Sequence, residues 1–477
     1  MEHFESLYPA NTRENEIAKI LGFVKEGNSC QIVSLPGGGR SNLLGLLTYN
    51  RNVRLKHLGE NQKWFHFVLS NFTEVRKRSL FDTTKFLFLN LVDSIRERGK
   101  QEEYQKLQNI FKESLSFNDE LVLFQGLKQA IDLLAIEKEL AVVFLFDRFE
   151  DYIPTVTPEF FTNLRVLRDR AKYRFSVVFS THKPLEDIIG AEILSDFYQF
   201  VAGHIVYLPL FDKDGLDFRI SYVEKVSGKK LGKEIIDSIL SITAGHPNLT
   251  RLAVEMMLET TDVILTRSVA KGKNLRDPSS RQVGTQGDMF DFLLEQKSMK
   301  AALYDIWKTL TPAEQKLLTN VILNEVKNLD PSVVSIPQDD KQNNYLQNVG
   351  LFKNNKFTIP LFEQFIKKEI SQTIPQAKQK IAFDLNTHDI TKGELVLSDT
   401  LTPSEFKLLR YLVQNPNKII EREEIINIVW ANTKSTAGVT DQALDQLIFR
   451  VRKKIEDDPN NPEHLQTVKG RGFRFLP

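Results

Sequence analysis

Short apolar runs alternate with longer segments of helical periodicity over the first 210 residues. The runs are residues 30–35, 64–69, 140–146, 175–180 and 205–210. Amphipathic segments such as residues 85–96 and 160–170 lie between them. Apolar runs of this length are typical of strands buried on both faces, and their alternation with helices predicts a parallel sheet covered by helices. We therefore expect an α/β domain over residues 1–211.

The pattern changes after residue 211. Residues 212–259 keep a helical periodicity without a strand-like run, so we expect a helical lid over residues 212–266. Residues 267–290 are polar, contain several Gly and Ser residues and are poor in apolar side chains, as is typical of a linker. A domain boundary is therefore predicted within that segment.

A nine-residue pattern occurs twice beyond the linker, as Leu310-Thr-Pro-Ala-Glu-Gln-Lys-Leu-Leu318 and Leu401-Thr-Pro-Ser-Glu-Phe-Lys-Leu-Leu409. In each copy Thr can cap a helix, Pro follows at the first helical position and Glu completes a capping box. A hairpin-like stretch ends each segment, at residues 351–359 and 466–475. We expect two α+β winged-helix domains, at residues 291–370 and 371–477. The alternative is that two common capping boxes match by chance.

The last hundred residues predict a small antiparallel sheet at residues 380–397 and helices at residues 403–414, 422–430 and 439–456. The third helix has one apolar stripe, formed by Leu444, Ile448, Val451 and Ile455. Another face carries the residues Gln442, Gln446, Arg450 and Lys453. Gln and Arg can read base edges in the DNA major groove. A solvated helix face is the alternative interpretation.

The amino-acid composition excludes several classes of protein and requires any DNA-binding surface to be local. The 477 residues are 41% hydrophobic and 26% charged, which excludes a wholly disordered or collagen-like chain. Lys+Arg total 63 against 62 Asp+Glu, so any DNA-binding surface must be local. The single cysteine, Cys30, excludes an intramolecular disulfide. No signal peptide or membrane-spanning run is evident, and we expect a cytoplasmic protein without a membrane partner.

The run at residues 30–35 leads into a glycine-rich loop, Pro36-Gly37-Gly38-Gly39-Arg40-Ser41-Asn42, and then a helix. Backbone amides in such a loop can cradle a phosphate at the helix N-terminus. Compared with the P-loop motif G-x-x-x-x-G-K-[ST], Ser34 replaces the first Gly and Arg40 replaces Lys, while Ser41 can ligate Mg²⁺. We expect ATP or ADP with Mg²⁺, and weak or absent hydrolysis because Arg40 replaces a compact ammonium with a planar fork.

Polar residues follow two of the predicted strands. Asp147 ends the run at residues 140–146, where P-loop ATPases hold Mg²⁺, and Glu150 or Asp151 can polarise a water. Alternatively, Asp147 caps the following turn. Thr181, after the next strand, can sense a terminal phosphate. Glu150 and Asp147 are thus the candidate catalytic residues.

Several short motifs occur in an order similar to that of AAA-like signal-transduction ATPases of the STAND class. They are Arg13-Glu14-Asn15-Glu16, the glycine-rich loop, the strand before Asp147, Phe179-Ser-Thr-His182 and Ala244-Gly-His-Pro-Asn248. The resemblance covers about the first 370 residues. It implies that Arg13 and Glu14 lie near the base or ribose and that His246 and Pro247 contact the nucleotide.

The last hundred residues closely resemble the OmpR/PhoB-type winged-helix domain of bacterial transcription regulators. The matching segments include residues 401–409, 415–425, 447–455 and 466–475. The resemblance implies that the third helix enters the major groove, with Gln442, Gln446 and Arg450 as base readers. It also implies backbone contacts by Arg452, Lys453, Thr467, Lys469 and Arg471. Position 449, often basic in that family, is Phe here.

These observations predict a bacterial transcription regulator in which a STAND-like ATP- or ADP-binding domain controls a winged helix on double-stranded DNA. Homo-oligomers and RNA polymerase are expected partners. No receiver domain is recognisable, so phosphotransfer is not expected. The alternatives are an AAA-like ATPase of DNA loading or replication initiation, and an adaptor with an inert nucleotide-binding fold. The first requires turnover, which the Arg40 substitution disfavours.

Overall fold

A computed structural model describes residues 3–270, 286–326, 341–353, 356–370, 381–384, 387–392, 395–431, 441–456, 459 and 462–476. Contacts between residues divide the chain into two compact units, Met1–Ser371 and Gln372–Pro477, and each is described by itself. Most of the predicted linker at residues 267–290 lies outside the described residues, as does the predicted turn at Asn354-Asn355.

The first unit contains a five-stranded parallel sheet with the order β2-β3-β4-β1-β5. Its strands are β1 (Cys30–Val33), β2 (Phe65–Asn71), β3 (Ala141–Asp147), β4 (Phe175–Thr181) and β5 (Ile205–Tyr207). Each predicted run overlaps one strand. The first and last runs extend past their strands because Leu35, Leu208 and Leu210 stay buried after the ladder ends. The apolar pattern therefore indicates which residues are buried, but it does not mark where strand pairing ends.

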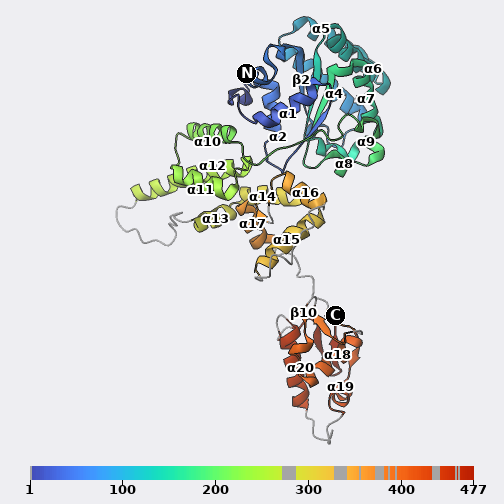
Figure 1. The fold of residues 1–477 in the computed structure, drawn as a ribbon, viewed down its shortest axis with the longest axis vertical. Coiled ribbons are helices and arrows are strands. Elements are labelled where there is room, and N and C mark those ends of the chain that lie inside the picture. The colour runs from blue at the N-terminus through green and yellow to red at the C-terminus, as the bar shows by residue number, and fades with distance from the viewer. Residues whose placement is uncertain are drawn as a thin grey trace. The chain divides into compact units, whose positions relative to one another are not determined.

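Helices cover both faces of this sheet, as predicted (Figure 1). They are α1 (Glu14–Lys25), α2 (Arg40–Tyr49), α3 (Arg51–Leu58), α4 (Leu80–Glu97), α5 (Gln101–Ser116), α6 (Glu120–Ile131), α7 (Pro158–Ala171), α8 (Leu185–Ile188) and α9 (Ala191–Tyr198). Alternate strand residues face opposite cores: Val143 and Leu145 pack with α1–α3, whereas Phe144 and Phe146 belong to the core of α4–α9.

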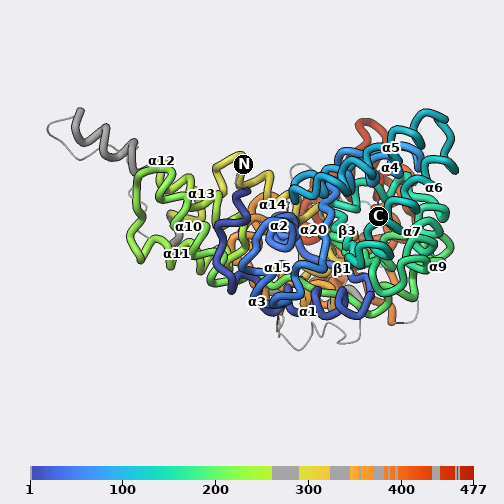
Figure 2. The backbone as a smooth tube through the Cα atoms, turned by 90° about the horizontal axis from the view of Figure 1, so that it is seen from above, coloured from blue at the N-terminus to red at the C-terminus, as the bar shows by residue number. Residues whose placement is uncertain are grey.

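The rest of the first unit is mostly helical. Its elements are α10 (Lys213–Ser227), α11 (Lys233–Thr243), α12 (Pro247–Ala270), α13 (Gln286–Glu295), α14 (Lys297–Thr309), α15 (Pro312–Val326), α16 (Lys341–Asn348), a hairpin of β6 (Phe352–Lys353) and β7 (Lys356–Phe357), and α17 (Pro360–Phe365). One continuous core joins β1 to α17, from Val33 to Phe365. Helices α10–α12 lie on the side of the unit away from α6, α7 and α9 (Figure 1 and Figure 2). The winged-helix interpretation of residues 291–370 stays a prediction.

The second unit has the predicted winged-helix elements. They are β8 (Ile381–Phe383), β9 (Ile390–Lys392), β10 (Leu395–Val396), α18 (Pro403–Gln414), β11 (Ile419–Ile420), α19 (Arg422–Val429), α20 (Asp441–Ile455), β12 (Leu465–Val468) and β13 (Gly472–Phe475). The strands form antiparallel sheets of order β10-β9-β8 and β11-β13-β12. The apolar stripe of α20 is buried, as expected, in the core that the three helices share.

Among the described residues, no helix is both long and apolar enough to cross a membrane.

Candidate functional site

The carboxyl ends of β1, β4 and β3 meet at one edge of the first unit's sheet, in that order. Residues 34–39 connect β1 to α2, and Gly37 and Gly39 in this loop have φ of 73° and 98°. A Cβ on Gly37 would come 2.6 Å from the Cβ of Asn248. Gly39 occupies the N-cap of α2 and has no side chain to cap it, so the first amides of α2 can bind an anion.

A cavity of about 960 Å³ opens at this edge. It is lined by the candidate catalytic residue Glu150 and by much of the predicted nucleotide-binding set: Arg13, Gly37, Gly38, Gly39, Arg40, Ser41, Asn42 and Pro247. Further basic side chains that the sequence motifs did not indicate also line it: Arg76, Arg148, Arg219, Arg251 and Lys308. Both the size and the basic lining suit an anionic ligand with several phosphates.

Arg40, Glu150 and His182 form a compact cluster at the cavity wall. Arg40 Nη2 donates to Glu150 Oε1 at 2.7 Å, and His182 Nε2 lies 2.8 Å from the same oxygen. His182 Nδ1 lies 2.9 Å from Arg40 Nη2. Burial alone would raise the pKa of Glu150, but the charge of Arg40 and the contact with His182 lower it to about 2. Glu150 is therefore an ionised partner of Arg40.

The strand order explains this cluster. β4 lies between β1 and β3 in the sheet. His182, which follows β4, therefore lies beside both the loop after β1 and the turn after β3. Asp147 ends β3, and β4 lies between that strand and β1, which leads into the glycine-rich loop. Thr181 is buried and donates to the backbone oxygen of Lys183 at 2.6 Å, so His182 rather than Thr181 lines the cavity. Strand alternation accounts for the difference of one position.

The side chains of Arg13 and Glu14 have different surroundings in the structure. The buried Arg13 donates to the backbone oxygens of Pro209 and Gly38 at 2.6 and 3.1 Å, and it lines the cavity. Burial lowers the pKa of Arg13, and Asp212 opposes that shift. Glu14 is half exposed and pairs with Lys56 at 2.7 Å, and it is not part of the cavity lining.

His246 lies behind the glycine-rich loop. Burial lowers its pKa to about 4, so the ring is neutral near pH 7 and its Nε2 can donate to Pro36 O at 3.0 Å. Asn248 N donates to Gly37 O at 3.2 Å. The N-terminus of α12 thus supports the loop directly. Pro247 lines the cavity, whereas His246 does not.

The Mg²⁺ ligands predicted from sequence are oxygens of Ser41 and Asp147. Ser41 lines the cavity, whereas the buried Asp147 does not and accepts a hydrogen bond from Ser180 Oγ at 3.4 Å. The described residues contain no cluster of three or more His, Cys, Asp or Glu able to hold a metal. Of the two predicted ligands, the Ser41 hydroxyl is therefore the one that borders the cavity.

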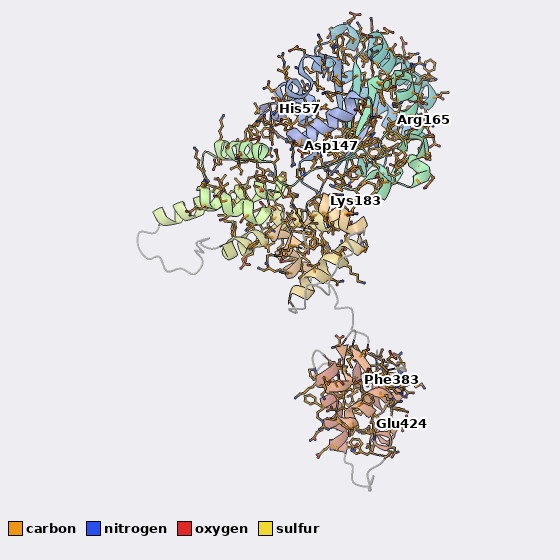
Figure 3. All side chains as sticks on the ribbon, viewed as in Figure 1. His57, Asp147, Arg165, Lys183, Phe383 and Glu424 are labelled. Atoms are coloured by element: carbon orange, nitrogen blue, oxygen red, sulfur yellow. The ribbon has the colours of Figure 1, made fainter. Side chains whose placement is uncertain are left out.

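The helices after the lid also contribute to the cavity. Asp305, Lys308 and Thr309 of α14 line it. Lys183, one residue beyond the Arg40 cluster, donates to both carboxylate oxygens of Glu314 on α15 at 2.5 and 2.6 Å. The Tyr345 hydroxyl of α16 donates to His182 O at 2.8 Å. Lys183 lies where the sheet meets these helices (Figure 3).

Sequence motifs could not reveal this contact, because the buried partners are separated by more than 130 positions along the chain. The available signal was a lysine two positions after the end of a buried strand. Burial of the Lys183–Glu314 pair is nearly complete, with the two side chains 10% and 3% exposed.

The second candidate site is the exposed face of α20 in the second unit. Gln442, Gln446 and Lys453 are exposed there, as predicted. Phe449 lies on the same face and is 40% exposed. Arg450 is displaced to one side, where its Nε lies 3.6 Å from Glu405 Oε1. No DNA contact was predicted for Phe449 from the sequence.

The wing places its predicted residues in two groups. Arg452 Nε and Nη2 donate to Leu465 O and Thr467 Oγ1 at 2.9 and 2.8 Å, so Arg452 and Thr467 join α20 to β12. Lys469 and Arg471 are exposed at the turn of the β12–β13 hairpin. Gly472 has φ of 126°, and a Cβ there would come 2.0 Å from Ile420 O. The wing therefore requires glycine at that position.

Residues 399–475 match the family described as "Transcriptional regulatory protein, C terminal". The chain is 38% identical over 96 residues to the sensory transduction protein RegX3 of Mycolicibacterium smegmatis. It is 34% identical over 97 residues to the phosphate regulon transcriptional regulatory protein PhoB of Escherichia coli. Each alignment covers 20% of this chain and 40% of the relative. The second unit is thus a domain of the matched family, and the chain spans less than half of these relatives.

The chain also has a weak likeness to solved structures. A Walker-type ATPase of Pyrococcus abyssi covers 77% of this chain and 97% of its own, with 13% identity and a TM-score of 0.44. At these values the likeness adds nothing to the sheet order and loop geometry described above.

Proposed function

We propose that this chain is a DNA-binding transcription regulator in which a nucleotide bound at the first unit controls the C-terminal winged helix. The family match of residues 399–475 is the observation that carries the DNA-binding half. The exposed α20 face supports it, because Gln and Arg side chains suit base edges and the wing cations Lys469 and Arg471 suit phosphates.

The cavity beside α2 supports the nucleotide-binding half. The uncapped helix N-terminus and Arg40 can hold phosphates, and Arg13 and Arg219 extend the basic lining. Mg²⁺, when bound with the nucleotide, would neutralise phosphate charge, with the Ser41 hydroxyl at the cavity as a protein ligand. We assign the ligand as ATP or ADP.

The Arg40 cluster favours control over turnover. A general base for water attack needs a pKa near the working pH, and Glu150 is held at about 2 by the cationic partner. A phosphate that engages Arg40 must compete with Glu150 for the guanidinium. This arrangement suits slow or absent hydrolysis, and it disfavours the alternative of a DNA-loading ATPase that depends on rapid turnover.

The contacts of β4 with the later helices supply a route for control. The same segment contacts the Arg40 cluster through the His182 ring and contacts α15 and α16 through Lys183 and the His182 carbonyl. A ligand that rearranges the cluster can therefore change how these helices pack.

The test is DNA binding by the full chain at fixed salt, with and without ATP–Mg²⁺, on duplexes obtained by in vitro selection. We expect a nucleotide-dependent affinity change of roughly fivefold or more, the lower range of allosteric coupling, that is lost in Arg40→Ala. Arg165→Ala is the matched control, because Arg165 is a half-exposed arginine of α7 that pairs with Asp196 away from the cavity (Figure 3). If the wild type binds DNA with the same affinity with and without nucleotide, the proposed control by nucleotide is wrong. If the wild type does not bind DNA, the proposed regulator function is wrong.

A further inference from the structure

The outward face of α20 is built around an aromatic residue. Gln442, Gln446, Phe449 and Lys453 are spaced by four, three and four positions, so at 3.6 residues per turn they form one row. The buried row of Leu444, Ile448, Val451 and Ile455 follows the same spacing. Phe449 therefore occupies the middle of the exposed row rather than its edge.

The surroundings of Phe449 are polar and charged, and they include the exposed Asp445 four positions before it, which pairs with Arg422. Lys453 Nζ lies 5.0 Å from the centroid of its ring, and the neighbouring exposed residues of the row are glutamines. Among the described residues of the second unit, Val396 on β10 is the other exposed large apolar residue. A protein-binding patch groups several apolar side chains, whereas a single aromatic ring among Gln and Lys fits a DNA groove.

The chemistry of the major groove offers one apolar feature. Thymine presents a C5-methyl group there, and apolar side chains including Phe contact it. Glutamine pairs with adenine through N6 and N7, so the glutamines beside Phe449 suit the adenines of the same A·T-containing segment.

We propose that Phe449 is a specificity-determining residue that selects thymine in the DNA site by packing its ring against the C5-methyl group. This inference rests on the proposed DNA-binding function. It assigns to position 449 an apolar contact with thymine, distinct from the guanine contact that a basic residue would make.

The experiment compares thymine with uracil, which lacks only that methyl group. Duplexes are first selected from a randomised library with the full chain at fixed salt, and each thymine of the enriched sequence is then replaced by deoxyuridine. We expect one or two replacements to weaken binding by the wild type about fourfold, the effect of losing one buried methyl group. Phe449→Ala should bind the thymine and uracil duplexes equally.

Two further variants separate the contact from a loss of folding. Phe449→Leu keeps an apolar side chain and should retain part of the methyl sensitivity. Phe449→Arg should shift the selected base at that position toward guanine. Unfolding of each variant, monitored by circular dichroism, checks that α20 stays folded.

The outcomes distinguish this inference from the proposed function. A selected sequence whose binding is insensitive to every uracil replacement, or whose sensitivity persists in Phe449→Ala, overturns the inference while leaving DNA binding intact. A library without any enriched sequence overturns both. If Phe449→Ala changes sedimentation of the protein but leaves base preference unchanged, the residue belongs to a protein interface instead.

Discussion

The two copies of the Thr-Pro-x-Glu motif begin helices in the same way, but their glutamates pair with lysines from different parts of the fold. In α15, Thr311 N donates to Glu314 Oε2 at 2.7 Å, and in α18, Thr402 N donates to Glu405 Oε2 at 2.9 Å. Both glutamates are 2% exposed. Each carboxylate therefore has capacity left for a second partner, because a carboxylate accepts more than one hydrogen bond.

The second partner differs between the copies. Glu314 binds Lys183, which comes from the end of the parallel sheet, so the motif joins α15 to the candidate nucleotide site. Glu405 binds Lys454 and approaches Arg450, both on α20, so the motif holds in its own domain the helix that we propose faces DNA. The local sequence specifies a buried carboxylate, and the tertiary structure decides which cation it serves.

The largest expected effect is that of Lys183→Met. Removing the lysine leaves the carboxylate of Glu314 buried without its cation, which costs about 3–5 kcal/mol of unfolding free energy. Urea denaturation followed by tryptophan fluorescence measures it. The double variant Lys183→Met/Glu314→Leu should recover most of the loss, and a loss below about 1 kcal/mol in the single variant would contradict the role of the pair.

Arg40→Met extends the comparison to a third carboxylate paired across elements. The pKa of Glu150 is about 2, below its ordinary 4.5, so the pair stabilises the fold above pH 4.5 and this stabilisation is lost as pH falls toward 2. In the variant the charge of Arg40 no longer lowers the pKa of Glu150, so this acid-side loss should be smaller and the unfolding free energy should fall less steeply between pH 4.5 and pH 2. The unfolding free energy measured from pH 2 to pH 6 should show different slopes for the two proteins, and parallel curves would be the contrary result.

Lys454→Met is the matched counterpart of Lys183→Met and should cost less. Lys454 is 29% exposed, and Glu405 keeps its bond to the Thr402 amide and its approach to Arg450. We expect a loss of about 1 kcal/mol, as for partly exposed pairs. The same urea experiment measures it, and equal losses for the two lysine variants would remove the distinction drawn here.

The smallest difference is expected between Thr311→Ala and Thr402→Ala. Both hydroxyls belong to capping boxes, so each replacement should cost about 1 kcal/mol. Thermal denaturation of the full chain checks this. Costs that differ by more than about 1 kcal/mol would show that the caps themselves, and not their second partners, separate the two copies.

The sequence predicted the individual helices, strands and loops better than it predicted which of them lie next to one another. Buried strands, the glycine-rich loop and both capping boxes are local patterns, and the structure contains each of them. Strand order is a non-local property, so the insertion of β4 between β1 and β3 was not predictable. The placement of His182 against Arg40 and Glu150 depends on that insertion.

The same reason limits the prediction of both sites. Gln442, Gln446 and Lys453 could be assigned to one helix face by spacing alone, and they are exposed together. Arg452 and Thr467 bond to each other across two elements, and Glu14 turns to Lys56, because side-chain pairing is settled by tertiary contacts. Roles that depend on such pairing stay predictions until binding is measured.

The segment that follows β4 determines where mutations that uncouple DNA binding from nucleotide should occur. One peptide bond separates the side chain in the Arg40 cluster from the lysine that holds α15. Under the proposed control, mutations that make DNA binding indifferent to nucleotide should therefore be concentrated at positions 182, 183, 314 and 345, and scarce on the far side of the sheet. Constitutive alleles would then map a surface of contact in the first unit, although none of these residues belongs to the DNA-binding domain.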